Sequence, residues 1–235
     1  MLKELFLSLA DFFYPPRCAN CGGMLEMSGS LCDGCRGGAF FVRSYLAQDI
    51  GIKDIDAVLV IAHYRGGLQE ILHKVKFFHE KHLTAILLKE FEKVWSKSGK
   101  EELYNLLDHF SVRNEKISAL TVPTDEERLK ERGYDLPEML FTGWAANEGY
   151  ELFKGLKRVK KTKPQYGLTG IERKNNMTGV MEAITVPDSK VILIFDDILT
   201  TGATLAECAR ALREKSSVDK VIIGIALASD NYGHE

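Results

Sequence analysis

Short apolar runs alternate along the chain with longer segments in which apolar residues recur every three or four positions. The short runs predict buried strands at 56–62, 117–122, 191–195 and 218–228, with a further strand near 151–159. The longer segments predict amphipathic helices at 68–78, 82–95, 101–110, 137–147 and 203–214, with a break in the pattern at 96–100. Because strands that alternate with helices build parallel sheets, the pattern predicts a doubly wound α/β fold, in which helices flank a parallel sheet.

Residues 1–14 also carry apolar side chains at helical spacing, and they predict a short amphipathic helix. Glu4 and Asp11 interrupt the apolar stretch, which argues against a signal peptide, and no segment of the chain is expected to span a membrane. An apolar helical stripe most simply packs on its own protein. Docking to a partner or to a membrane surface is the alternative.

Four of the five cysteines form two Cys-x2-Cys pairs, Cys18 with Cys21 and Cys32 with Cys35. Two such knuckles can place four thiolates around one tetrahedral Zn²⁺, and the spacing predicts a closed structural zinc site. A pair of disulfides is the alternative, but no secretion signal precedes the cysteines and cytosolic thiols are kept reduced. Cys208, on the last predicted helix, is expected to be a core residue.

Length and composition fit one main core with a small appendage. The chain has 235 residues, of which 45% are hydrophobic and 27% charged, as in an ordinary globular protein. The cysteine module precedes the first strand of the predicted sheet, so we expect a domain boundary near residue 50. Residues 1–50 would form the amphipathic helix and the zinc module, and residues 51–235 the α/β domain.

The most informative stretch is Ile-Leu-Ile-Phe-Asp-Asp-Ile-Leu-Thr-Thr-Gly-Ala-Thr at 192–204, where two carboxylates and a hydroxyl-rich turn join a strand to a helix. Unpaired N–H groups and the positive end of the helix dipole meet at such a turn, so a phosphate can bind there. The residues expected to hold it are Thr200, Thr201, Gly202, Ala203 and Thr204. Asp196 and Asp197 stand just before the turn, where their carboxylates would accept hydrogen bonds from two neighbouring sugar hydroxyls.

This stretch resembles the phosphoribosyl pyrophosphate (PRPP) signature of the type I phosphoribosyltransferases. An ordinary core strand ending in a polar turn is the alternative, which the paired acids disfavour. A Walker A loop is excluded because the turn has no Gly-Lys-Ser/Thr ending, and a Rossmann loop because no G-x-G-x-x-G follows a strand.

An active site of this type would displace pyrophosphate from the anomeric carbon of ribose. Asp196 and Asp197 would then be the catalytic residues, favouring the positive charge that develops on the sugar, and Mg²⁺ would neutralise the pyrophosphate. Lys76, Arg128 or Arg132 could offset the remaining negative charge of PRPP. For each of these three side chains, a surface salt bridge is an equally good interpretation.

Residues 154–174 carry eight basic residues and one acid, although the chain as a whole has a formal net charge of −2. Such asymmetry indicates an anionic partner. The candidate nucleic-acid contacts are Lys160, Lys161, Lys163 and Tyr166, with the tyrosine available to stack on a base. A solvated edge whose charge only promotes solubility is the alternative, and a PRPP site also needs cations.

Several shorter motifs stand in a fixed order between the cysteine module and the PRPP-like turn. They are Tyr64-Arg65-Gly66-Gly67-Leu68, Lys76-Phe77, Val122-Pro123, Arg128-x3-Arg132-Gly133-Tyr134, Thr162-x2-Gln165 and Glu172-Arg173-x2-Asn176. Taken together, the motifs resemble the ComF competence-protein family over nearly the whole chain. The resemblance implies a type I phosphoribosyltransferase-like fold with a zinc finger, in a cytoplasmic bacterial protein of natural transformation that handles incoming single-stranded DNA.

The resemblance also implies partners, namely a competence DNA helicase and recombination mediator proteins, which could bring the protein to the inner face of the membrane. The chain departs from the family pattern in two places. Asp135 stands where the family usually carries Asn, and residues 124–127 are Thr-Asp-Glu-Glu where many relatives place a basic residue. Both changes weaken the case for pyrophosphate binding by this loop. Thr200 replaces the acid that takes a proton from a purine in some phosphoribosyltransferases.

Three functions therefore fit the sequence. The first is a competence factor that binds PRPP, or another 5′-phosphorylated ribose or nucleic-acid end, and assists DNA passage. The second is an active phosphoribosyltransferase with an unidentified acceptor. The third is an interaction adaptor whose zinc module and amphipathic helix dock a partner while the old active site is only structural.

Overall fold

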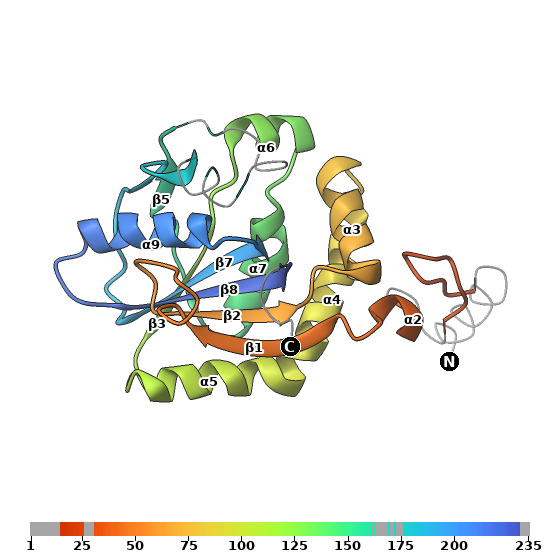
Figure 1. The fold of residues 1–235 in the computed structure, drawn as a ribbon, viewed down its shortest axis with the longest axis horizontal. Helices are drawn as coiled ribbons and strands as arrows, with labels where there is room; N and C mark the ends of the chain where they lie inside the picture. The colour runs from red at the N-terminus through yellow and green to blue at the C-terminus, as the bar shows by residue number, and fades with distance from the viewer. Residues whose placement is uncertain are drawn as a thin grey trace, which may run out of the picture.

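The computed structural model describes residues 15–25, 31–160, 162, 169, 172 and 176–230. Its centre is a six-stranded sheet with helices on both faces, and the expected α/β fold is thereby confirmed (Figure 1). In order of pairing, the strands are β1 (Phe40–Leu46), β2 (Ala57–Ala62), β8 (Val221–Ser229), β7 (Val191–Leu199), β3 (Ile117–Thr121) and β4 (Glu151–Leu152). A second, two-stranded sheet pairs β5 (Leu156–Arg158) with β6 (Met181–Ala183).

All neighbouring strands of the large sheet are parallel, except that β1 runs antiparallel to β2 at one edge. Parallel neighbours need crossover connections, and these are helical here. The helical segments are α2 (Asp33–Arg36), α3 (Gly66–Phe77), the short turn Lys81–Leu83, α4 (Thr84–Val94), the π-turn Trp95–Gly99, α5 (Lys100–His109), α6 (Glu126–Arg132), α7 (Leu136–Asn147) and α9 (Ala203–Lys215).

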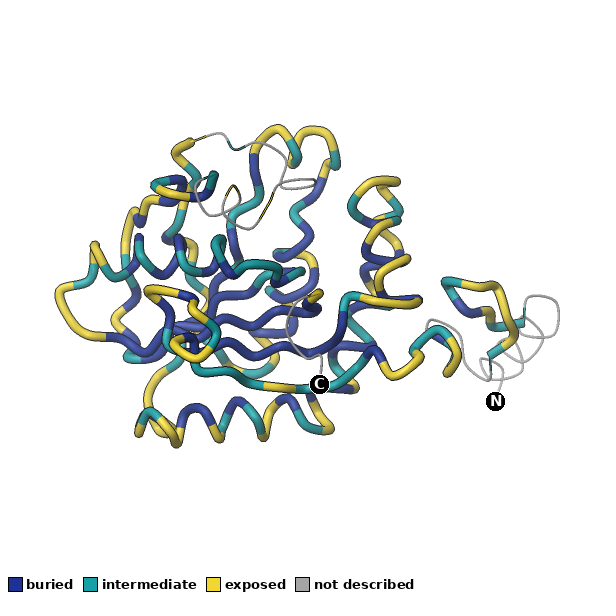
Figure 2. The backbone as a smooth tube through the Cα atoms, in the orientation of Figure 1, coloured by how far each residue is buried: buried dark blue, intermediate teal, exposed yellow. Residues whose placement is uncertain are grey.

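The sheet is covered on both faces, so most residues of its central strands are buried (Figure 2). In β7 the side chains alternate between the two cores, because successive residues of a strand point to opposite faces. Val191, Leu193 and Phe195 pack in the core beneath α3, α4, α5 and α7, whereas Ile192 and Ile194 pack beneath α9. All nine residues of β8 are buried, as expected of a central parallel strand.

One aromatic cluster fills the core on the α4–α7 side of the sheet. The ring of Phe91 lies 4.8 Å from that of Trp144, which in turn lies 4.7 Å from Trp95 and 5.4 Å from Phe195. The predicted break at 96–100 is absent, because a π-turn carries α4 into α5. Gly99 makes this possible, since a Cβ at that position would lie 2.8 Å from the indole of Trp95.

The structure differs from the sequence-based expectations in several elements. β1 was not expected, because its residues do not alternate clearly between buried and exposed positions. β7 continues past Phe195 through both aspartates to Leu199. The single strand expected at 151–159 is two short strands in different sheets, with Gly155 between them. The predicted domain boundary near residue 50 stays a prediction; β1, on its amino-terminal side, is hydrogen-bonded to β2.

In the part of the chain that the structure describes, no helix is both long and apolar enough to cross a membrane. Residues 1–14, for which an amphipathic helix is expected, lie outside the described residues.

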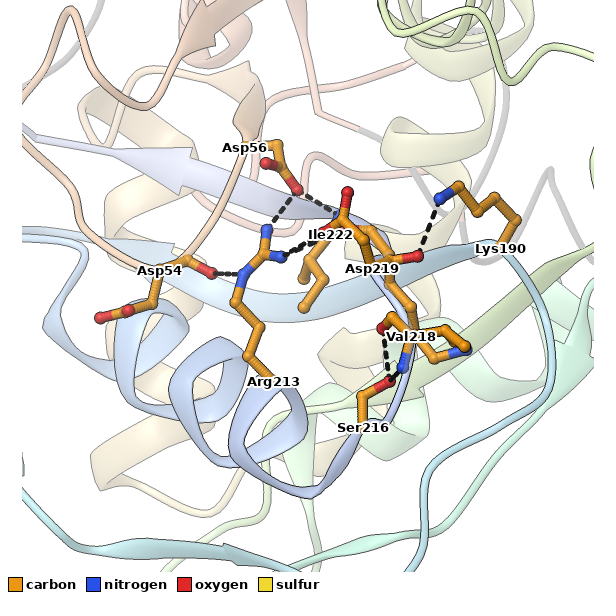
Figure 3. A network of polar contacts seen from close by, with 9 residues as sticks. Asp54, Asp56, Lys190, Arg213, Ser216, Val218, Asp219 and Ile222 are labelled. Carbon is orange, nitrogen blue, oxygen red and sulfur yellow. Dashed lines mark hydrogen bonds and ion pairs between the residues drawn. The ribbon is translucent and has the colours of Figure 1, made fainter.

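Arg213, near the carboxyl end of α9, ties that helix to the edge where β2 and β8 begin (Figure 3). Its Nε donates to the carbonyl of Asp54 at 2.7 Å, and its Nη2 lies 2.7 Å from Oδ2 of Asp56. The same Asp56 oxygen accepts the backbone N–H of Ile222 at 2.7 Å. These contacts hold one end of α9, so that the other end stays at the carboxyl edge of the sheet.

We expect Asp56→Ala to lower the free energy of unfolding by about 2 kcal/mol, because it leaves a buried N–H group and a guanidinium without their acceptor. Urea denaturation measures this difference. Asp219→Ala is the matched control, since Asp219 contacts the same arginine at 3.4 Å but its side chain is 86% exposed. Its effect should stay within about 0.5 kcal/mol. Equal losses in the two variants would contradict this role of Asp56.

Candidate functional site

Two parallel strands end side by side where the crossover connections of the sheet diverge. β7 leads through α9 to β8 on one side, and β3 leads through α6 and α7 to β4 on the other. Their carboxyl ends therefore flank a topological switch point, the place where open α/β sheets bind ligands. Asp196, Asp197 and the 200–204 turn lie at this edge, where the arrowheads of β2, β7 and β8 end in Figure 1, on the side of α3.

Asp197 is held by Lys76 of α3. The lysine Nζ lies 2.8 Å from Oδ1 of the aspartate, and the two side chains are only 16% and 11% exposed. The structure thus brings together two residues that the sequence proposed separately. Together with burial, which acts more strongly, the charge of Asp197 raises the pKa of Tyr64. A second contact holds α3 close to Lys76: the Tyr134 hydroxyl donates to the carbonyl of Val75 and so joins the loop after α6 to α3.

Asp196 has a different environment from its neighbour. Adjacent residues of a strand face opposite sides of the sheet, so Asp196 lies on the side of α9, where its charge acts on the buried thiol of Cys208. Burial and then the charge of Asp197 raise the pKa of Asp196 to about 7, although Lys76 and Arg158 act in the opposite sense. The two carboxylates therefore differ: Asp197 is paired with Lys76, whereas Asp196 binds its proton more tightly than an ordinary aspartate.

The turn that begins α9 needs glycine at position 202 for two reasons. Gly202 has φ +72°, and a Cβ there would lie 2.3 Å from Cδ1 of Ile52. Thr201 Oγ1 accepts the N–H of Ala203 at 3.4 Å, while the first N–H groups of any α-helix have no partner within the helix. A hollow of about 250 Å³ lies beside the turn, and Thr201, Gly202 and Ala203 form part of its lining, together with Ile52, Met177 and Thr178.

Arg158 belongs to this edge of the sheet, although the sequence placed it only within the basic tract. Its Nε donates to the carbonyl of Pro123 at 3.0 Å, and its Nη1 donates to Thr162 at 3.1 Å and lies 3.4 Å from Asp125. Burial lowers the pKa of Arg158, while Asp125 acts in the opposite sense. No sequence signal singles out this arginine, because the pairing of β5 with β6 is what carries it to the end of β3.

The remaining predicted cations lie on α6 and in the segment after β5. Arg128 and Arg132 are on α6, and Arg128 is close enough to Arg158 to lower its pKa further. The Arg132 guanidinium lies 5.8 Å from the ring centre of Tyr134. Lys160 is exposed and its Nζ lies against the backbone of Gly179. Lys161, Lys163 and Tyr166 lie outside the described residues.

The four cysteines of the amino-terminal module form one cluster. The sulfur atoms of Cys18, Cys21, Cys32 and Cys35 all lie within 4.8 Å of one another. A tetrahedral Zn²⁺ with bonds of about 2.3 Å separates its sulfur ligands by roughly 3.8 Å, and Sγ of Cys21 lies 3.7 Å from Sγ of Cys32. A single cluster of this size fits zinc rather than two separate disulfides, so the donor set supports structural Zn²⁺.

The four thiols are close enough to change one another's pKa. Although burial opposes it, backbone N–H groups lower the pKa of Cys18 to about 6. A hydrogen bond from Asn20 favours the thiolate of Cys35, but burial and the neighbouring cysteines raise its pKa to about 12. Four thiolates at this separation repel one another unless a cation compensates their charge. When bound, zinc would supply that charge and close the module.

The cysteine module packs directly on the helices of the α/β domain. A Cβ at Gly67, in the first turn of α3, would lie 2.8 Å from Cβ of Cys35, so only glycine permits this approach. Nε of Arg36 lies 2.9 Å from Oε2 of Glu90 on α4, whose carboxylate is 1% exposed. Arg65 donates to the carbonyl of Gly38 at 2.8 Å. The helix that carries Lys76 toward Asp197 is thus fixed to the cysteine module at its other end.

Known proteins match both parts of the chain. Residues 9–48 match a family model described as a double zinc ribbon domain. The chain is 26% identical over 242 residues to "Competence protein F" of Haemophilus influenzae, and the alignment covers 92% of this chain and 99% of that protein. The similarity therefore extends through the cysteine module, the sheet and the turn before α9. In this chain the matched zinc-ribbon range contains four cysteines, enough for one tetrahedral zinc.

Cys21→Ser is expected to lose the zinc that the wild-type protein retains, because it removes one of four thiolate ligands. The variant should also begin to unfold at a lower temperature, since the cluster is what closes the module. Metal analysis by atomic emission and a thermal melt measure the two effects. Cys208→Ala is the control, because Cys208 is a buried residue of α9, outside the cluster, and its loss should leave the zinc content unchanged. A zinc-loaded Cys21→Ser protein would contradict the assignment.

The pKa of Asp196 predicts a pH dependence of stability. This carboxyl binds its proton more tightly in the folded chain, with a pKa of about 7 against an ordinary value of 3.8. Its contribution to stability is complete below pH 3.8 and is lost as the pH rises through about 7. Asp196→Asn should therefore gain stability relative to wild type across this window, by up to about 1.4 kcal/mol per pH unit. Urea titrations at several pH values test it; a difference independent of pH would refute it.

Proposed function

We propose that this chain, whose resemblance to the ComF competence proteins is confirmed, acts in natural competence by binding PRPP or a related 5′-phosphorylated ribose at the β7–α9 turn. Its protein partners would be those of that process, a DNA helicase and recombination mediators, and its place would be the cytoplasm. We propose the biological role from the similarity to a protein named as a competence protein. We propose the ligand from the arrangement of the site.

The ion pair between Lys76 and Asp197 is the observation that carries the ligand assignment. It places a cation beside the carboxylates, at the switch point and before the helix amino terminus. A ribose 5-phosphate carries an anion at one end and neighbouring hydroxyls on the ring. The amino terminus of α9 suits the phosphate, and the carboxylates of Asp196 and Asp197 suit the hydroxyls.

The two carboxylates would have different roles in binding such a ligand. Asp197, paired with Lys76, would accept hydrogen bonds from the ribose hydroxyls and stabilise positive charge on the ring. Asp196, with its raised pKa, would ionise when a cation approaches, because a nearby positive charge favours the carboxylate. A Mg²⁺ ion accompanying PRPP would supply that charge and neutralise the pyrophosphate. Arg128, Arg132 and Arg158 border the space where the pyrophosphate would extend.

We further propose that binding, rather than turnover, is the principal activity. Thr200 offers no carboxylate to deprotonate a nucleobase at the turn, and the 124–127 loop is acidic where a pyrophosphate would need cations. The bound ribose phosphate would then serve the handling of incoming single-stranded DNA, either as an effector or as the phosphorylated end of a strand.

Titration with PRPP and Mg²⁺ in a calorimeter should give saturable binding, and Asp197→Asn should weaken it at least about tenfold. The reason is that the substitution removes the charge which pairs with Lys76 and accepts the ribose hydroxyls. Asp188→Asn is the matched control, because Asp188 is an exposed aspartate in the segment before β7. No heat from the wild-type protein at millimolar PRPP would eliminate this function and leave the adaptor interpretation.

A second measurement distinguishes PRPP binding without turnover from phosphoribosyltransferase activity. Pyrophosphate is measured after PRPP, Mg²⁺ and a panel of nucleobases are added to the wild-type protein. The proposal expects no release above the rate of Asp197→Asn. Base-dependent release that this variant lacks would instead make the chain an active phosphoribosyltransferase.

A further inference from the structure

Two adjacent aromatic side chains are exposed where α3 ends. Phe77 is 55% exposed and Phe78 64%. Nine large hydrophobic side chains of the described residues are exposed, and these two are the aromatic members of that group. The others lie on other elements and are Met24, Leu129, Met139, Leu152, Val159, Ile184 and Val218. The end of α3, which Figure 2 shows as exposed, is therefore the one place in the described chain where exposed aromatic rings gather.

A histidine holds the two rings together. The ring of His73 lies 4.8 Å from that of Phe77, one helical turn later, and 5.6 Å from that of Phe78. We call His73, Phe77 and Phe78 the ring cluster. Its members support one another from one side, while the exposed fractions of both phenylalanines leave ring surface open to solvent. Exposed ring surface of this extent indicates a binding site.

Cations flank the ring cluster on both sides along the chain. Lys74 precedes the phenylalanines, and Lys81 follows them after the exposed His79. His79 adopts φ +59°, a left-handed conformation uncommon outside glycine, and it ends the helix. Within 73–82 the acid is Glu80, which lies 4.0 Å from His82; of the three lysines, Lys76 pairs with Asp197, which leaves Lys74 and Lys81. This segment is therefore positive, although the whole chain has a net charge of −2.

We propose that the ring cluster, with Lys74 and Lys81, binds single-stranded nucleic acid, the rings stacking on bases and the lysines contacting phosphates. Aromatic rings beside cations are the chemistry by which proteins hold single strands without regard to sequence. An apolar protein partner fits less well, because charged and imidazole side chains surround the rings instead of an aliphatic groove. The inference rests on the proposed handling of single-stranded DNA and adds the surface that would carry it.

The surface is separate from the candidate ribose phosphate site, although both use α3. Lys76 points to Asp197 at 2.8 Å and is largely buried, whereas Phe77 and Phe78 face solvent. Substitutions in the ring cluster should therefore leave PRPP binding intact.

Fluorescence anisotropy with a labelled oligothymidylate tests the proposal on the full chain. The double substitution Phe77→Ala with Phe78→Ala should weaken binding roughly 5- to 150-fold, the range expected when one stacked base loses its ring. Phe77→Tyr with Phe78→Tyr should restore it, because stacking requires a ring and not phenylalanine itself. Lys74→Gln with Lys81→Gln should instead lower the slope of log affinity against log salt. Val218→Ala, which truncates an exposed aliphatic side chain elsewhere, is the control.

The outcomes separate this inference from the function on which it rests. If the wild-type chain fails to bind oligothymidylate, the handling of single strands by this protein is refuted. If it binds and the double alanine variant, shown by thermal melting to be folded, binds equally well, only the ring cluster is refuted. Equal affinity for an oligonucleotide without bases would also overturn stacking. A double alanine variant that changes sedimentation of the chain but not oligonucleotide affinity would assign the surface to a second copy instead.

Discussion

Two adjacent carboxylates at the buried end of β7 are the constraint around which this edge of the structure is organised. Like charges so close cannot both be ionised in a desolvated place unless a cation is brought to them. The strand separates them to opposite faces, and Lys76 of α3 compensates Asp197 at 2.8 Å. Asp196 responds differently, with a pKa raised to about 7. A site built in this way favours ligands that bring hydrogen-bond donors and a cation.

The helix that carries Lys76 also connects the amino-terminal module to the sheet. α3 begins against Cys35, where Gly67 permits direct contact, and approaches its end at Lys76. The buried ion pair of Arg36 with Glu90 fixes the module to α4 as well. The position of Lys76 thus depends on packing at both ends of α3. Structural zinc would contribute to the site through this packing, and not through chemistry of its own.

Different side chains of α3 and its carboxyl end would serve the two proposed binding surfaces. Its buried residues pack in the core, Lys76 turns to the carboxylates, and the two phenylalanines after it stay exposed. A ribose phosphate and a single nucleic-acid strand both contain a pentose and phosphate, so neighbouring surfaces for the two are chemically coherent. The similarity to a competence protein over nearly the whole chain is consistent with that combination.

The sequence by itself determined the elements whose signals are local: the alternation of strands and helices, the cysteine pairs, and the turn from Asp196 to Thr204. It determined these because hydrophobic periodicity and motif spacing are properties of neighbouring residues. Tertiary structure alone decided that Lys76 meets Asp197, 121 residues away, that Arg158 reaches the end of β3, and that β1 joins the sheet. Each of these depends on pairing and packing between distant segments, which no local pattern encodes.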